Sequence, residues 1–226
     1  MEKKVLILDS GILINFAMNG LLDVLENLKK SFDGKFIITK QVKYETIDKP
    51  INIQRFELEA LEIKDLLDKK ILELPDSLGI SEAAINKKLY LLMETANHLL
   101  NRNNQPIKIV SEAEMSCLAL SSLLSEKGIK NIIGIDERTT RILAEKPENL
   151  EKIMEKKLHI NLELKEKDFS AFKNFKFIRS AEMVYVAHKK GLIKIKDPRT
   201  LEALLYATKF KGSSISWDEI NTLKKL

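Results

Sequence analysis

The feature that most constrains the fold is the alternation of short aliphatic runs with longer stretches of helical spacing. Residues 5–8 are an unbroken aliphatic run, residues 18–30 repeat leucine at helical intervals, and residues 35–40 form a second short aliphatic run. Two strands joined by a helix favour parallel pairing. The chain is therefore expected to begin with a β-α-β unit of a parallel sheet.

The same alternation continues to about residue 146. Its pattern predicts helices over 41–48, 55–70, 82–102 and 111–128, a short apolar run at 71–74, a loop at 101–106, and strands at 107–110 and 131–135. Gly128 is the expected end of the fourth helix. We therefore predict the α/β class.

The helical stretch 82–102 carries an apolar stripe whose members step by 4, 3, 4 and 3 residues: Ile85, Leu89, Leu92, Ala96 and Leu99. Such a stripe is either the seam of a homodimer or the side of a helix that packs on the protein's own core. Because the stripe is short, we expect the second.

Composition and cysteine content indicate a soluble, cytoplasmic protein. Hydrophobic residues make up 44% of the 226, enough for a sizeable core, and the single Cys117 excludes an internal disulfide framework. Asp9 and Asn15 interrupt the apolar start in a way that a signal peptide does not. No run approaches the roughly 20 apolar residues of a membrane span.

Charge divides the chain into two parts. Residues 161–226 hold 14 Lys and Arg against 8 Asp and Glu, a net +6, whereas residues 1–160 hold 24 against 25. We therefore predict a domain over 1–160, with a helical insertion at about 51–105, followed by a basic helical region over 161–226. The basic region suits a polyanionic partner such as RNA, or it is simply a soluble surface.

Aromatic residues gather at 168–179, where Phe169, Phe172, Phe175 and Phe177 alternate with basic residues. Aromatic rings beside cations can stack the bases of single-stranded RNA, but Phe at this spacing more often anchors a segment to the core, which we expect here. Better candidates for phosphate contacts are Lys189, Lys190, Lys194, Lys196 and Arg199.

Four carboxylates follow predicted strands. Asp9 ends the first strand and Asp136 the strand 131–135, while Glu45 and Glu114 lie in the helices that follow 35–40 and 107–110. Parallel strands place such residues at one edge of the sheet, where four acids would repel one another unless a cation lay among them. Oxygen ligands select Mg²⁺ or Mn²⁺, which polarises a phosphodiester and activates a bound water.

Each acid also has a purely structural interpretation. Asp9 can cap the turn at Ser10, Glu114 can close a capping box with Ser111, and Glu45 can be a solvated helix residue. Asp136 and its neighbour Glu137 both open a helix, where the helix dipole favours acids.

In order, the four acidic blocks resemble those of PIN-domain proteins, including VapC-like toxins and archaeal PIN proteins: VLILDSGILINFA, ITKQVKYETI, SEAEMSCLALSS and IIGIDERTTRILAEK. The resemblance spans roughly residues 3–146, with the helical stretch 51–105 between the second and third blocks. Residues 191–216 also look like the C-terminal helices of some PIN proteins. The third block departs from the common Gly-Glu-Ala-Glu, since Ser111 stands where glycine is usual.

The resemblance implies a three-layer α/β/α fold and metal-dependent cleavage of RNA. It implies that Asp9, Glu45, Glu114 and Asp136 form the acidic cluster, that Ser10 supports the first, and that Glu137 is an alternative to Asp136 as metal ligand. An antitoxin or an RNA-processing protein would be a partner. The alternative is a non-catalytic RNA-binding or assembly module on the same scaffold. A phosphatase using Asp9 is less favoured because Gly11, and not a second acid, follows two residues later.

Overall fold

The computed structural model describes residues 4–165 and 168–226; residues 1–3 of the predicted first domain and 166–167 of the predicted basic region lie outside it. The described chain is α/β, as predicted, with a five-stranded parallel sheet in the order β3-β2-β1-β6-β8. The strands are β1 (Lys4–Leu8), β2 (Lys35–Ile37), β3 (Leu72–Glu73), β6 (Lys130–Gly134) and β8 (Phe177–Ile178).

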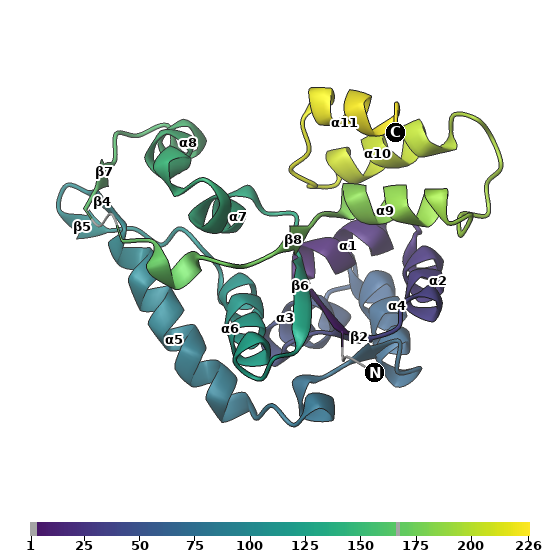
Figure 1. The fold of residues 1–226 in the computed structure, drawn as a ribbon, viewed down its shortest axis with the longest axis horizontal. Helices are drawn as coiled ribbons and strands as arrows, with labels where there is room; N and C mark the ends of the chain where they lie inside the picture. The colour runs from purple at the N-terminus through teal and green to yellow at the C-terminus, as the bar shows by residue number, and fades with distance from the viewer. Residues whose placement is uncertain (1–3, 166–167) are drawn as a thin grey trace.

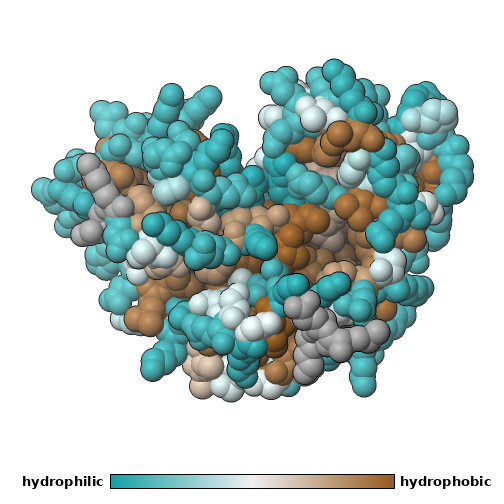
Figure 2. All heavy atoms as spheres, in the orientation of Figure 1, coloured by the Kyte–Doolittle hydropathy of each residue, from teal (hydrophilic) through white to brown (hydrophobic). Residues whose placement is uncertain are grey.

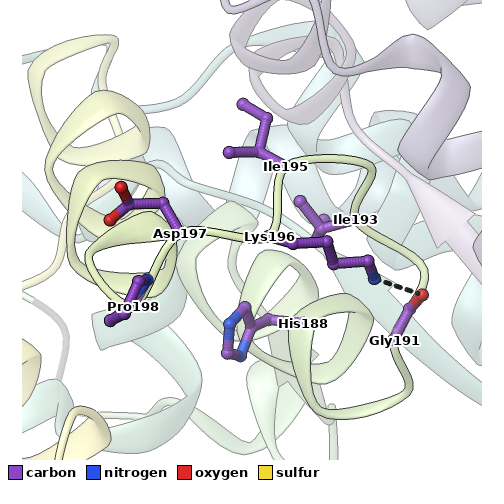
Figure 3. A pocket seen from close by; sticks show the side chains of 7 residues that line it. All are labelled: His188, Gly191, Ile193, Ile195, Lys196, Asp197 and Pro198. Carbon is purple, nitrogen blue, oxygen red and sulfur yellow. Dashed lines mark hydrogen bonds between the residues drawn. The ribbon is translucent and has the colours of Figure 1, made fainter.

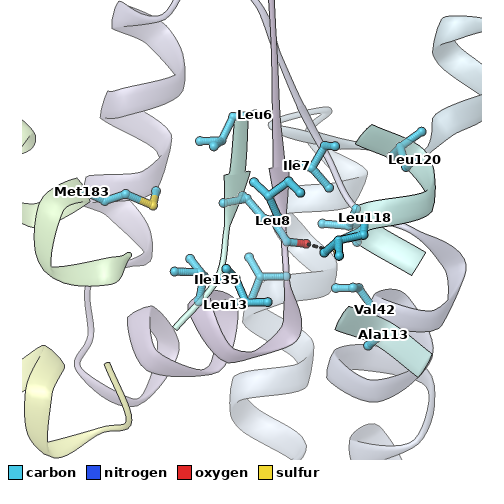
Figure 4. Packing of buried hydrophobic residues seen from close by; sticks show 14 of the residues in the cluster. Leu6, Ile7, Leu8, Leu13, Val42, Ala113, Leu118, Leu120, Ile135 and Met183 are labelled. Atoms are coloured by element: carbon cyan, nitrogen blue, oxygen red, sulfur yellow. Dashed lines mark hydrogen bonds between the residues drawn. The ribbon is translucent and has the colours of Figure 1, made fainter. Parts of the chain in front are cut away.

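The central strand β1 is aliphatic because both of its faces are covered. Figure 4 shows Ile7 pointing to the side of Leu118 and Leu6 to the side of Met183. Neighbouring β6 approaches β1 closely at Gly134, where a Cβ atom would lie 2.9 Å from Leu8 Cδ2. A larger residue there would require the Leu8 side chain to move.

Helices lie on both sides of this sheet (Figure 1). On one side α6 (Glu112–Glu126) packs on β6 and carries α5 (Glu82–His98) on its outer surface, with α3 (Lys40–Lys43) beside α6. Three helices on the other side pack together: α1 (Ser10–Met18), α2 (Leu22–Ser31) and α9 (Ser180–Lys189), and α4 (Glu57–Asp68) contacts α1. The remaining α-helices are α7 (Arg138–Glu145), α8 (Leu150–Leu158), α10 (Thr200–Phe210) and α11 (Trp217–Leu223).

A hairpin occupies the stretch that was predicted to hold the end of a helix and a loop. β4 (Leu100–Arg102) pairs antiparallel with β5 (Gln105–Pro106) and with β7 (Glu163–Leu164), whereas residues 107–110 form no strand. Asn103 and Asn104 have φ of 50° and 62°, the positive values that a type I′ hairpin turn requires. The prediction of a strand at 107–110 was therefore wrong, and the preceding helix ends at His98, before the hairpin.

The apolar stripe of α5 belongs to the core, as expected. Ile85, Leu89, Leu92 and Ala96 are buried, and Leu99 follows them into the interior. The opposite side of the helix exposes Tyr90 and Leu91 to solvent. The stripe is thus not available as a dimer seam, and a homodimer stays a prediction.

Residues beyond 160 complete the main sheet. β8 pairs parallel with β6, and α9 packs on α1 and α2. Phe172 is fully buried and Phe169, Phe175 and Phe177 pack against the core, so these rings anchor the segment as expected. The predicted boundary at residue 160 stays a prediction, but the two sides of it share one sheet.

The carboxyl ends of β6 and β8 face a notch in the surface (Figure 2). One lobe beside the notch carries α7 and α8, and the other carries α9, α10 and α11. None of the helices in the described part of the chain combines the length and the apolar character needed to cross a membrane.

Candidate functional site

Asp9 lies where the central strand ends. Its amide donates to Gly134 O (2.9 Å), which extends the β1–β6 pairing by one residue, and its carboxylate caps α1 by accepting from Gly11 N (3.2 Å). Only 3% of the residue is exposed, and none of the described lysines or arginines pairs with it. Burial, then the charges of Glu114 and Glu45, raise the pKa of Asp9 to about 7.

Ser10 links Asp9 to Glu45. The Ser10 hydroxyl lies 2.8 Å from Glu45 Oε2 and 3.5 Å from Asp9 Oδ1. Because the hydroxyl has one proton, the shorter contact is the donated bond. Glu45 itself lies in a π-helical turn, Tyr44–Asp48, that continues α3. Such wide turns are frequent at functional sites, and the sequence analysis did not foresee this one.

Glu114 closes the predicted capping box of α6. Its carboxylate accepts from Ser111 N (2.9 Å), and its own amide donates to Ser111 Oγ (3.2 Å). Thr140 of α7 adds a third contact by donating its hydroxyl to Glu114 Oε2 (2.9 Å). Burial raises the pKa of Glu114, and the charge of Glu137 adds to this effect. Glu114 therefore caps a helix and also acts electrostatically on Asp9.

Asp136 is buried and held by partners that the sequence analysis missed. Ser180 donates its amide to Oδ1 (2.9 Å) and its hydroxyl to Oδ2 (2.6 Å), and Asn15 Nδ2 donates to Oδ2 (3.2 Å). Burial raises the pKa of Asp136, while the bonds from Ser180 act in the opposite direction. Asp136 is near Asp9, because a Cβ atom on Gly11 would lie 3.4 Å from Asp9 Oδ2 and 3.8 Å from Asp136 Cβ.

Glu137 lies on the side of Glu114. Its carboxylate caps α7 by accepting from Thr140 N (2.9 Å), and it forms an ion pair with Lys157 of α8 (2.8 Å). Asp136 is turned instead toward Ser180, so the two candidates for the fourth acid face different partners.

The structure thus brings Glu45 and Glu114 into electrostatic range of Asp9 and links Glu137 to Glu114 through Thr140. As arranged, no three His, Cys, Asp or Glu side chains in residues 4–165 and 168–226 form a ready metal-binding group. The chemistry of the donors still fits Mg²⁺ or Mn²⁺, since Mg²⁺ is commonly held by one or two carboxylates and keeps several waters.

A cavity of about 410 Å³ opens beside Glu45 and the start of α6. Lys49 and Lys108 lie on it, are exposed, and form no ion pair within the described chain; Tyr44 lies beside them with 57% of its surface exposed. Lys40 also lines the cavity but pairs with Glu82. The predicted phosphate contacts did not include these lysines; Lys49 and Tyr44 lie close to Glu45 in the sequence, whereas Lys108 is brought to it only by the fold.

Most of the predicted phosphate contacts already have partners within the chain. Lys194 pairs with Asp23 and Arg199 with Asp197, while Lys189 donates to Leu226 O and Lys196 to Gly191 O. Figure 3 shows Lys196 reaching Gly191 across a cavity of about 300 Å³ lined by His188. Lys190 is exposed. A role of these five residues in RNA binding stays a prediction.

Comparison with known proteins identifies no relative. No family model, no curated protein and no solved structure matches the chain. The function therefore has to be inferred from the site itself.

Proposed function

We propose that the protein is a divalent-metal-dependent endoribonuclease of the PIN-domain type. The observation that carries the proposal is the environment of Asp9: a buried carboxylate at the end of the central strand, with two further acids in range and, among residues 4–165 and 168–226, no cationic side chain paired with it. Isolated buried charge is costly. A hard divalent cation is the partner that such a site favours.

Asp9 and Glu114 would hold the ion, with Glu45 reached through Ser10, and with Asp136 or Glu137 as the fourth acid. When bound, Mg²⁺ or Mn²⁺ would polarise the phosphodiester and make a bound water more acidic. The chain's own groups orient this site: Ser10 fixes Glu45, Ser111 and Thr140 fix Glu114, and Gly11 leaves the space between Asp9 and Asp136 free.

Two further features support the proposal, one in the charges near the site and one in the fold. The unpaired Lys49 and Lys108 lie on the cavity beside Glu45, where they can neutralise phosphates that flank the scissile bond. The parallel sheet with helices on both sides is also compatible with the three-layer fold that the sequence resemblance implies. RNA as the substrate, an antitoxin or RNA-processing partner and a cytoplasmic location remain part of the proposal.

The test is cleavage of a labelled RNA pool by the purified chain with Mn²⁺, with Mg²⁺ and with chelator. Asp9→Asn should abolish cleavage, whereas Asp33→Asn, at an exposed acid far from the site, should not. Circular dichroism shows whether each variant is folded. A folded wild-type chain that cuts no RNA with either metal would overturn the proposal.

A second candidate is a non-catalytic RNA-binding module. Asp136 and Glu137, the two candidates for the fourth acid, already have partners within the protein. Ser180 and Asn15 donate hydrogen bonds to Asp136, and Lys157 forms an ion pair with Glu137, and this pairing favours the second candidate. This candidate predicts RNA binding that weakens with salt and does not change with chelator or with Asp9→Asn. Binding that requires metal would exclude it.

A further inference from the structure

Three aromatic side chains form an exposed cluster on α10 and α11. The ring of Tyr206 lies 6.4 Å from that of Phe210 and 5.4 Å from that of Trp217, and Phe210 and Trp217 are 6.0 Å apart. Phe210 is 71% exposed and Trp217 53% exposed. Exposed aromatic side chains that touch one another, unlike singly exposed ones, often mark a binding site.

Cations accompany the rings. Lys209 Nζ lies 4.8 Å from the centre of the Trp217 ring and also donates to Ile215 O, which leaves its other protons for a phosphate. Lys211 is exposed and forms no ion pair within the described residues. Both lysines belong to the region with a net charge of +6. Aromatic faces beside ammonium groups suit a nucleic acid strand, whose bases stack while its phosphates meet the cations.

The cluster also lies next to the acidic edge of the sheet. The loop between α10 and α11 is fastened there, because Ser214 N donates to Asp136 O (3.3 Å) and Arg141 donates to Ser214 Oγ (3.0 Å). Arg179 holds the same loop by donating to Ser214 O (3.0 Å). In Figure 1, α10 and α11 form the lobe beside the notch at this edge, and Figure 2 shows hydrophobic atoms at its surface.

Packing of α11 on α10 explains only part of this arrangement. Tyr206 is partly buried and packs against the core, as a ring that joins two helices should. Phe210 and Trp217 instead leave more than half of their surface in solvent, unlike the fully buried anchor Phe172. Their outward faces therefore contribute little to holding the helices together.

We propose that Phe210 and Trp217 form a stacking platform for the unpaired bases of a single nucleic acid strand, with Lys209 and Lys211 next to its phosphates. This binding site is distinct from the cleavage site proposed above and needs neither Asp9 nor a metal ion. A strand on the platform would extend toward the notch where the carboxylates lie.

Trp217 is the only tryptophan of the chain, so its fluorescence reports on the platform directly. We would titrate the full-length protein, in chelator, with a twelve-nucleotide uridine strand and with an RNA duplex of the same length. The single strand should quench Trp217 emission to saturation, and the duplex should not. Phe210→Ala should weaken binding about tenfold, the effect of losing one stacked base.

Matched variants separate stacking from folding. Phe210→Leu retains apolar packing but removes the π face, so it should weaken binding as Phe210→Ala does. Tyr90→Ala removes an equally exposed ring on α5 and should leave binding unchanged. Lys211→Ala should lower the slope of log affinity against log salt by about one.

Unchanged Trp217 emission while the anisotropy of labelled RNA shows binding would overturn the proposal. Equal affinity of Phe210→Leu and the wild type would overturn it as well, and would point to a protein ligand for the rings. Because chelator is present, the result is independent of cleavage. Quenching without nuclease activity supports the platform alone, and cleavage without quenching supports the nuclease alone.

Discussion

Replacing Asp9 with asparagine should stabilise the metal-free protein above neutral pH. The variant keeps the size of the side chain and an oxygen that can accept from Gly11 N, so the cap of α1 is retained. It removes a negative charge that is buried beside two other acids. In the wild type, burial and then the charges of Glu114 and Glu45 raise the pKa of Asp9 from 3.8 to about 7.

The direction and the size of this stabilisation follow from the linkage between proton binding and folding. Between pH 3.8 and pH 7 the unfolded chain has lost a proton that the folded chain keeps, so folding stability falls as pH rises through this window and levels off above it. About 3 pKa units correspond to about 4 kcal/mol. The free energy of unfolding that the wild type loses through this titration, and that Asp9→Asn recovers, is therefore about 2 kcal/mol at pH 5.5 and about 4 kcal/mol at pH 8.5.

Urea denaturation in chelator at these two pH values measures the difference. The advantage of Asp9→Asn should grow by about 2 kcal/mol between them, and Asp33→Asn should show no such trend. Mn²⁺ should reduce the difference in the free energy of unfolding between Asp9→Asn and the wild type, because the ion stabilises only the protein that binds it, which is the wild type. A variant that is less stable than the wild type at pH 8.5, or a gap that does not change with pH, would refute the electrostatic reasoning.

Three other measurements test the packing around the site. Ser180→Ala should lower the free energy of unfolding by about 1–3 kcal/mol in urea denaturation, since buried Asp136 loses a donor; Ser77→Ala, at an exposed serine, should change it little. Leu92→Ala should cost about 2–5 kcal/mol and leave the mass in light scattering unchanged, whereas Tyr90→Ala should cost less than about 0.5 kcal/mol; a change of mass with Leu92→Ala would contradict the core assignment. Burial raises the pKa of Cys117, so a thiol reagent should label it only after unfolding, and rapid labelling of the folded chain would contradict that burial.

Features that depend on residues close together in the sequence were predictable. The capping box of Ser111 and Glu114 needs only residues three apart, and the parallel arrangement follows from the alternation of short strands with helices. The proximity of Asp9 to Glu45 also followed, because β1 and β2 are parallel and end at a common edge. Glu114 does lie near Asp9, but the strand at 107–110 that was expected to place it there does not form.

Features that depend on distant segments were not predictable. Nothing near Asp136 indicates that Ser180, 44 residues later, will donate two hydrogen bonds to it. Lys108 reaches the cavity beside Glu45 only through the fold. The Asn103-Asn104 turn did carry a local signal, since asparagine tolerates positive φ, but the polar stretch around it is also typical of a loop.

Because β8 comes late in the chain and pairs with β6, the order of synthesis affects how the acidic edge forms. β6 is made long before β8, so in the growing chain one side of it is an open sheet edge, and Asp136 lacks its two hydrogen bonds from Ser180 until that residue emerges from the ribosome. Open edges recruit other strands, which makes this interval the time when the nascent chain is most exposed to aggregation. The environment of Asp136 is therefore completed late, only after β8 has joined the sheet.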